Sequence, residues 1–224
     1  MAQVKEDNID ISEKIGKAEK YVAENKKSLS IIGGAVIAVI AVYIGYRQFV
    51  VKPQEENAQK EMYVAEQYFS KDSVNLAIKG DGSFPGFEEI TESYGSSKSG
   101  NLAQYYLGIS LLKKGEYENA IEALKAYDAE DDITGALALG GIGSAHLELG
   151  HHDEALDYFK KAADWDENNF TVPLFLMKAA LVYDLKKDYK SSLDIYNRIK
   201  TDYPNSTEAR DIDKYIGRAE SLAK

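Results

Sequence analysis

The chain has 224 residues, with 27 basic and 37 acidic side chains, a net charge of −10 and no cysteine. Nucleic-acid surfaces need a basic patch, so this balance argues against nucleic acid as a partner. The lack of cysteine excludes disulfides and a cysteine-linked lipid anchor. Four prolines and plentiful Ala, Leu, Lys and Glu favour an all-α fold.

Residues 1–27 form a leader with six lysines and six acids, and therefore no net charge. Asp10 and Glu13 have the spacing of a capping box. Apolar residues then recur at helical spacing: Ile11, Ile15, Ala18 and Val22. We expect a short amphipathic helix. It either docks a partner or is only a lead-in to the next segment, in solvent or at the membrane interface.

Residues 28–51 contain the most apolar part of the chain. Ser28 to Tyr46 are nineteen consecutive uncharged residues, and a helix of that length is about 28 Å long, close to the hydrocarbon thickness of a bilayer. Basic residues flank the run on both sides, which disfavours the alternative of a buried core helix. The sequence predicts one transmembrane helix, with these residues as membrane or partner contacts: Gly33, Gly34, Ile37 and Gly45.

The distribution of basic residues predicts the orientation of this helix. Five lysines closely precede it, and three basic residues, Arg47, Lys52 and Lys60, closely follow it. Positive charge favours the cytoplasmic side, so we expect a cytoplasmic N-terminus and an exported C-terminal part. Residues 43–51 are bulky and offer no small-residue cleavage site, so the helix is expected to be an uncleaved signal anchor.

Residues 52–100 are predicted to form a linker helix and an irregular helical pre-repeat. A helix is expected over 53–69, and a breaker cluster of glycine and polar residues follows at 79–83. A short helix is expected over 84–94, as the second half of an irregular repeat with 53–69 packed beside it. Residues 95–101 read as a Ser/Gly loop.

Residues 101–205 repeat an internal pattern three times. Small and large residues return with spacings of 35 and 37, as in Gly108, Gly143 and Ala180, or Leu124, Phe159 and Tyr196. Each copy reads as helix, turn, helix, and Pro204 stands where the third copy ends. This is the tetratricopeptide repeat (TPR) pattern, which stacks into an α-solenoid. Residues 206–224 are predicted to form a C-terminal capping helix.

TPR geometry places one face of each first helix in a concave groove. The residues expected there are largely apolar: Leu102, Tyr105, Ile109, Leu112, Leu137, Gly140, Ser144, Leu147, Leu174, Met177, Leu181 and Asp184. The Lys and Asn clamp of TPR proteins that hold a terminal carboxylate is missing. An apolar groove suits an amphipathic helix or an extended hydrophobic segment. The alternative, given equal weight, is that the array's own N-terminal helix or its C-terminal cap fills the groove.

Chemistry-bearing motifs are few. His146 falls on a packing position, and the adjacent His151 and His152 of a turn do not face one another as metal ligands would. The glycines in 140–143 fit close helix packing better than a phosphate loop. Residues 164–169 begin like a calcium loop but lack the required glycine and glutamate. We therefore expect no cofactor, no metal and no catalytic residues, and predict a non-enzyme.

The leader and span together suggest a family. The stretch Tyr21-Val22-Ala23-Glu24-Asn25-Lys26-Lys27 enters one Gly/Ala/Ile span that ends in Tyr46-Arg47-Gln48, and a helix continues into the repeats. This resembles the YfgM-like ancillary subunits of the bacterial SecYEG translocon.

The resemblance implies a single-pass protein of the bacterial inner membrane with a periplasmic TPR domain. Its implied partners are the translocon, a PpiD-like membrane-anchored chaperone of the prolyl-isomerase type, and exported unfolded chains. The longer insertion at 79–100 departs from that family. The alternative is a TPR scaffold in another envelope assembly, such as secretion or cell division.

Overall fold

A computed structural model describes residues 14–17 and 19–223. The chain divides into two compact units, Met1–Pro53 and Gln54–Lys224. Within the described residues the structure is helical and contains no strand, only an isolated bridge between Gly80 and Pro85. The predicted all-α class is confirmed.

The first unit consists of helix α2 (Lys26–Tyr46) and the π-helical segment η1 (Arg47–Val51), with residues 14–17 and 19–24 also helical. Asp10, Ile11, Glu13 and Ala18 of the predicted capping box and leader helix lie outside the described residues. An 18-residue apolar window in this helix has no buried residue, and it is long and apolar enough to cross a bilayer. A Cβ added at Gly33, Gly34 or Gly45 would meet nothing within 4 Å.

The second unit opens with α3 (Lys52–Ser70), α4 (Val74–Lys79) and α5 (Phe87–Tyr94). Three predicted features need correction here. The predicted loop at 95–101 is shorter, because Ser97 caps a helix that begins at Lys98. Helix α4 is an addition to the predicted elements, and α5 begins three residues later than the predicted start at Phe84. The reason is that Gly86 is extended and Phe84 belongs to the loop closed by the Gly80–Pro85 bridge.

Helix α3 runs parallel to α6 (Lys98–Lys114), as successive first helices do in a repeat array. Near the start of both helices, the Glu55 carboxylate accepts hydrogen bonds from the Ser99 amide (3.1 Å) and hydroxyl (2.6 Å). Past the end of α3, Asp72 pairs with Lys113 near the end of α6 (2.9 Å). Helices α3 and α5 therefore form an additional, irregular helix pair whose connection is lengthened by α4 and its loop.

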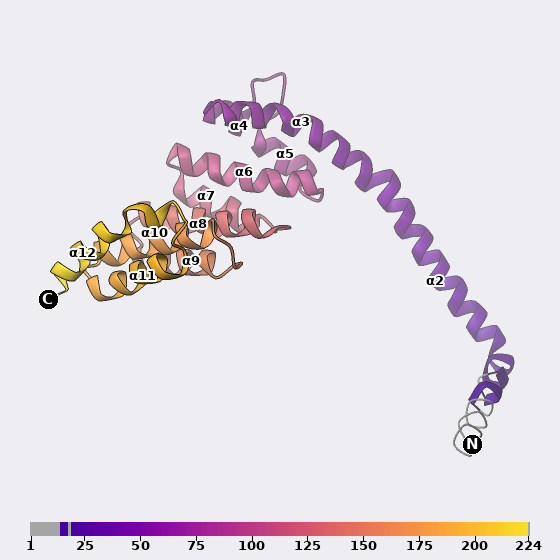
Figure 1. Cartoon of the computed structure of the whole chain (residues 1–224). Coiled ribbons are helices and arrows are strands. Elements are labelled where there is room, and N and C mark those ends of the chain that lie inside the picture. Colours follow the sequence, from indigo (N-terminus) through magenta and orange to yellow (C-terminus); the bar gives the residue numbers. More distant parts are fainter. Residues whose placement is uncertain (1–13, 18, 224) are drawn as a thin grey trace, which may run out of the picture. The chain divides into compact units, whose positions relative to one another are not determined.

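Three regular helix pairs and a terminal helix follow (Figure 1). They are α6 with α7 (Tyr117–Ala126), α8 (Asp132–Glu148) with α9 (His152–Ala163), and α10 (Thr171–Leu185) with α11 (Tyr189–Asp202). The predicted capping segment contains a 3₁₀ turn, Glu208–Asp211, and α12 (Ile212–Leu222). Ile212, Ile216 and Ala219 are its buried residues.

The turn inside each regular pair needs one residue in the left-handed region. Gly115 (φ 86°) and Gly150 (φ 78°) fill that place in the first two pairs, where glycine costs no steric strain. The third pair has Lys187 there, with φ 63°. The third turn thus keeps the same backbone geometry, although a left-handed conformation is sterically unfavourable for lysine.

Small residues allow the helices to cross closely. A Cβ on Gly108 would meet the Leu124 side chain at 2.5 Å, and a Cβ on Gly143 would meet the Phe159 ring at 2.8 Å. Phe159 and Tyr196 are fully buried in the core of the later repeats. Their burial supplies the apolar stabilisation that an isolated helix pair lacks.

Candidate protein-binding surfaces

The first-helix face is the surface formed by the predicted groove residues of α6, α8 and α10. Most of their side chains are half-buried: Leu102, Tyr105, Ile109, Leu112, Leu137, Ser144, Leu147, Leu174 and Met177. Leu181 is more open, with 37% of its surface exposed, and Leu185 one turn further is 61% exposed. The most accessible apolar part of this face therefore lies on α10. Leu185 was missed by sequence reasoning, although its spacing of four from Leu181 indicates the same face.

Tyr105 is held inside the face by other aromatic rings. Its ring centroid lies 5.6 Å from those of both Tyr106 and Tyr127. Burial, with a smaller contribution from neighbouring charges, raises the pKa of Tyr105 to about 12. The phenol is thus neutral at physiological pH and presents an apolar ring with one polar atom.

At the centre of the face, α8 contributes two small residues, Gly140 and Ser144. The Ser144 hydroxyl donates to the Gly140 carbonyl oxygen at 2.9 Å, within its own helix. A Cβ on Gly140 would fall 1.8 Å from the Phe175 ring, because that ring lies against the glycine backbone. Gly140 is buried, which differs from its expected place as a groove contact, and close packing is confirmed as the reason for its glycine.

Asp184 also differs from the groove prediction. Its side chain is only 6% exposed, accepts a hydrogen bond from the Tyr196 hydroxyl (2.8 Å), and forms an ion pair with Arg218 of α12. Burial and the bond to Asp184 raise the pKa of Tyr196. The C-terminal helix therefore covers the last predicted position of the face.

Helix α3 borders the face at its other end. The Phe69 ring packs edge-on against Tyr106 (5.3 Å between centroids), and the Lys113 ammonium lies 4.7 Å from the Phe69 ring centre. Tyr106 in turn stacks on Phe87 of α5, at 5.2 Å. The irregular pair is thus joined to the first regular repeat by aromatic contacts.

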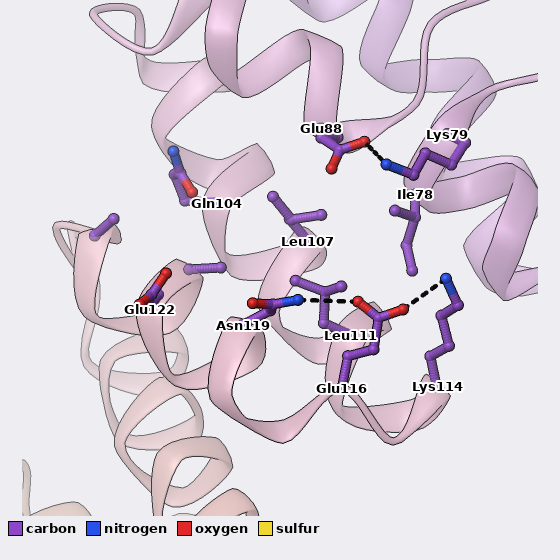
Figure 2. A pocket seen from close by; sticks show the side chains of 12 residues that line it. Ile78, Lys79, Glu88, Gln104, Leu107, Leu111, Lys114, Glu116, Asn119 and Glu122 are labelled. Carbon is purple, nitrogen blue, oxygen red and sulfur yellow. Dashed lines mark hydrogen bonds and ion pairs between the residues drawn. The ribbon is translucent and has the colours of Figure 1, made fainter.

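A second candidate surface is a pocket of about 480 Å³, which we call the α7 pocket. Ile78, Leu107 and Leu111 supply apolar side chains to it (Figure 2). Ala123 is a further apolar lining residue. Its polar residues are Lys79, Glu88, Gln104, Lys114, Glu116, Asn119 and Glu122, and Ala126 completes the lining. Sequence reasoning did not find this pocket, since its lining comes from four helices and one of them, α4, was not predicted.

The histidines do not form a metal site. His146 stacks on Tyr158 at 5.4 Å, with His151 at 5.8 Å. Burial, followed by the Lys125 charge, lowers the pKa of His146, which favours the neutral ring. Among the described residues, no group of three or more His, Cys, Asp or Glu side chains is arranged to hold a metal ion.

The loop that begins like a calcium site has a structural role. The Asn168 side-chain oxygen accepts hydrogen bonds from the backbone amides of Phe170 (2.9 Å) and Thr171 (2.7 Å), where α10 begins. Trp165 lies against Gly135, where a Cβ would meet its ring at 2.4 Å. These contacts fix the passage between two repeats.

The fold and its surfaces define a helical-repeat protein. Residues 87–132, 136–169 and 175–206 each match the tetratricopeptide repeat family, and the chain belongs to that family. TPR proteins are protein–protein interaction scaffolds and are generally non-catalytic. The prediction of a TPR-type solenoid is confirmed.

Solved structures show the same fold. The crystal structure of MamA protein aligns with a TM-score of 0.55 and 18% identity, over 75% of this chain and 92% of that one. A putative kinesin light chain of Podosopora anserina with nearly identical TPR-like repeats aligns with a TM-score of 0.57 and 12% identity, over 75% and 87%.

Curated relatives match over short regions. Tetratricopeptide repeat protein 29 is 28% identical over 120 residues in Macaca fascicularis and 27% over 137 residues in Homo sapiens, covering 51% and 57% of this chain. Anaphase-promoting complex subunit 3 of Schizosaccharomyces pombe is 34% identical over 58 residues, covering 26% of this chain and 8% of that protein. The chain spans about a quarter of the length of the first two, 24% and 27%.

Proposed function

We propose that the chain is a non-catalytic adaptor of the bacterial inner membrane, anchored by α2. The observation that carries this proposal is an apolar helix without buried residues followed in the same chain by a TPR scaffold. Leu181 and Leu185 leave apolar surface exposed on the first-helix face, which suits a partner's amphipathic helix or extended segment. The proposed orientation has a cytoplasmic N-terminus and a periplasmic TPR domain.

The proposed partners follow from the resemblance of residues 21–54 to YfgM-like subunits. They are the SecYEG translocon, reached through the span, and a PpiD-like chaperone or exported unfolded chains, reached through the TPR domain. Gly33, Gly34, Ile37 and Gly45 would provide close approach for the channel's helices. The competing proposal, a scaffold in another envelope assembly, shares the anchor and the scaffold and differs only in the partners.

The orientation is testable with single thiols, because the chain has no cysteine of its own. Glu220→Cys places a thiol on the exposed part of α12, and Lys17→Cys places one before the span. In intact cells with a permeabilised outer membrane, an impermeant maleimide should label Glu220→Cys and spare Lys17→Cys until the inner membrane is opened. The reverse labelling pattern would reject the proposed topology.

The partners are testable by co-purification in mild detergent. Wild-type chain should recover the translocon and a prolyl-isomerase-type chaperone. Leu181→Asp should lose the chaperone and keep the channel, since it changes the TPR surface alone. Asn197→Asp, on exposed surface of α11, is the matched control and should keep both. Recovery of a cell-division or secretion machine in place of the translocon would establish the competing proposal.

A further inference from the structure

We infer that the α7 pocket is a second peptide-binding site, which takes a short segment carrying an apolar side chain beside a lysine or arginine. This site is distinct from the first-helix face. Its volume of about 480 Å³ lies in the range of small-ligand pockets, and its lining combines five apolar side chains with seven polar ones.

The apolar part of the pocket consists of Leu107 and Leu111 of α6, Ile78 of α4 and Ala123 of α7. They are buried within the chain, at 8%, 7%, 1% and 7% exposure, yet their outer atoms line the cavity. The pocket lies over α6, and residues of α4, α5 and α7 complete its lining. An aliphatic or aromatic side chain inserted here would gain burial without displacing a core residue.

Five of the seven polar side chains of the pocket are paired with one another before any ligand arrives. Lys79 forms an ion pair with Glu88, and Lys114 pairs with Glu116 (2.7 Å), which also accepts a hydrogen bond from the Asn119 amide (3.1 Å). In Figure 2 these pairs lie toward one side of the pocket, whereas Gln104 and Glu122 lie toward the other. A preorganised rim lowers the ordering cost of binding.

The charge balance of the rim selects a cationic ligand. Its two lysines are each matched by a carboxylate, and Glu122 is an additional acid. Hydrogen bonds from Lys114 and Asn119 lower the pKa of Glu116, so its carboxylate is ionised at neutral pH. Among the described residues, Glu122 has no ion-pair partner. A lysine or arginine beside the inserted apolar side chain would pair with Glu122.

Gln104 supplies the recognition of the ligand's main chain. Its side-chain amide forms no hydrogen bond with the described residues, and it combines a donor and an acceptor. A peptide group of an extended segment offers the complementary pair. The apolar residues and Glu122 therefore set which ligand side chains are preferred. Gln104 adds affinity that does not depend on the ligand's sequence.

The test uses full-length protein in detergent micelles and a phage-displayed library of random dodecapeptides. Selected peptides should be enriched in an apolar residue near a lysine or arginine and depleted of Asp and Glu. Their affinities are then measured by fluorescence anisotropy with the synthetic peptides. Ala126→Trp, which fills the pocket from an exposed position, and Glu122→Lys, which reverses the rim charge, should each weaken binding at least about tenfold.

Glu118→Lys is the matched control, since it makes the same charge change on α7 outside the pocket and should leave affinity unchanged within about twofold. Unfolding midpoints show whether each variant is folded. If Ala126→Trp does not fold, the affinity of Glu122→Lys alone tests whether the peptides bind in the α7 pocket. Peptides without the basic preference, or peptides that bind both pocket variants as tightly as wild type, would overturn the inference. Loss of binding in Leu181→Asp alone would assign the peptides to the first-helix face and would also overturn it.

Discussion

The Tyr196 hydroxyl donates a 2.8 Å hydrogen bond to Asp184, and this bond joins the second helix of the last repeat to the first. Tyr196 is fully buried, and Asp184 pairs at the same time with Arg218 of α12. The other oxygen of the Asp184 carboxylate, Oδ1, is buried without a partner among the described residues. The end of the array therefore depends on a buried carboxylate that needs both donors.

Tyr196→Phe is expected to destabilise the protein by about 1–3 kcal/mol, because the buried carboxylate loses a donor and gains none. Urea unfolding followed by circular dichroism measures the change. Tyr189→Phe is the control, since the Tyr189 hydroxyl makes no hydrogen bond with the described residues. Equal midpoints for the two variants would show that the bond to Asp184 contributes nothing.

Gly140→Ala should destabilise the array by about 1–3 kcal/mol through overpacking, because the new methyl would overlap the Phe175 ring. Gly217→Ala adds the same methyl on α12, where nothing lies within 4 Å, and is expected to stabilise by about 0.5–1 kcal/mol. The two variants have opposite predicted signs in one thermal-unfolding experiment. A stabilising Gly140→Ala would mean that Phe175 does not lie against this glycine.

Lys187→Gly is predicted to stabilise the third repeat by about 1 kcal/mol. Lys187 has φ 63°, a left-handed conformation that costs a non-glycine residue steric energy, and its two counterparts in the chain are already glycine. Chemical denaturation compares the variant with wild type. Gly115→Lys, the reverse exchange in the first repeat, should cost a similar amount, and no change in either variant would contradict the argument.

His146 makes stability depend on pH. Burial and the charges of Lys125 and His151 hold its pKa below the ordinary value of 6.5, whereas Glu154 opposes this shift. Below about pH 6.5 the unfolded chain therefore binds a proton that the folded chain does not, so stability falls as the pH decreases. The predicted slope reaches at most about 1.4 kcal/mol per pH unit.

Comparison with His146→Leu isolates this effect, because both chains share every other titrating group. Urea midpoints are measured between pH 7.5 and about 5. The wild type should lose more stability than the variant over this interval. Parallel pH profiles would show that His146 has the same pKa in the folded and unfolded chain.

The repeats were predictable because small and large residues mark each helix crossing directly in the sequence. Gly143 of α8 and Phe159 of α9, for example, mark one such crossing, where a Cβ on the glycine would lie 2.8 Å from the ring. Helix α4 escaped prediction since six residues give too little periodicity to distinguish a helix from a loop. The parallel placement of α3 on α6 depends on contacts between residues more than forty positions apart, such as Glu55 and Ser99.

The candidate surfaces were predictable only in part. Repeat position placed Tyr105, Ile109 and Leu181 on the first helices, but it placed Asp184 there too, where Arg218 covers it. The position of a residue within its repeat predicts the direction of its side chain. It does not predict which helix from another part of the chain covers that side chain, as α12 covers Asp184. The α7 pocket was hidden for the same reason, as its rim joins Lys79 and Glu88 of the irregular pair to Glu116 of the next.

In-cell photo-crosslinking tests the central claim most directly. A photoreactive amino acid is placed at Leu181, on the first-helix face, at Asn197 on α11 as the control, and at Ile37 in the span. We expect adducts of Leu181 with a periplasmic chaperone or an exported chain, adducts of Ile37 with the translocation channel, and no such adducts at Asn197. A silent Leu181, or adducts of Leu181 with cytoplasmic proteins, would contradict the account.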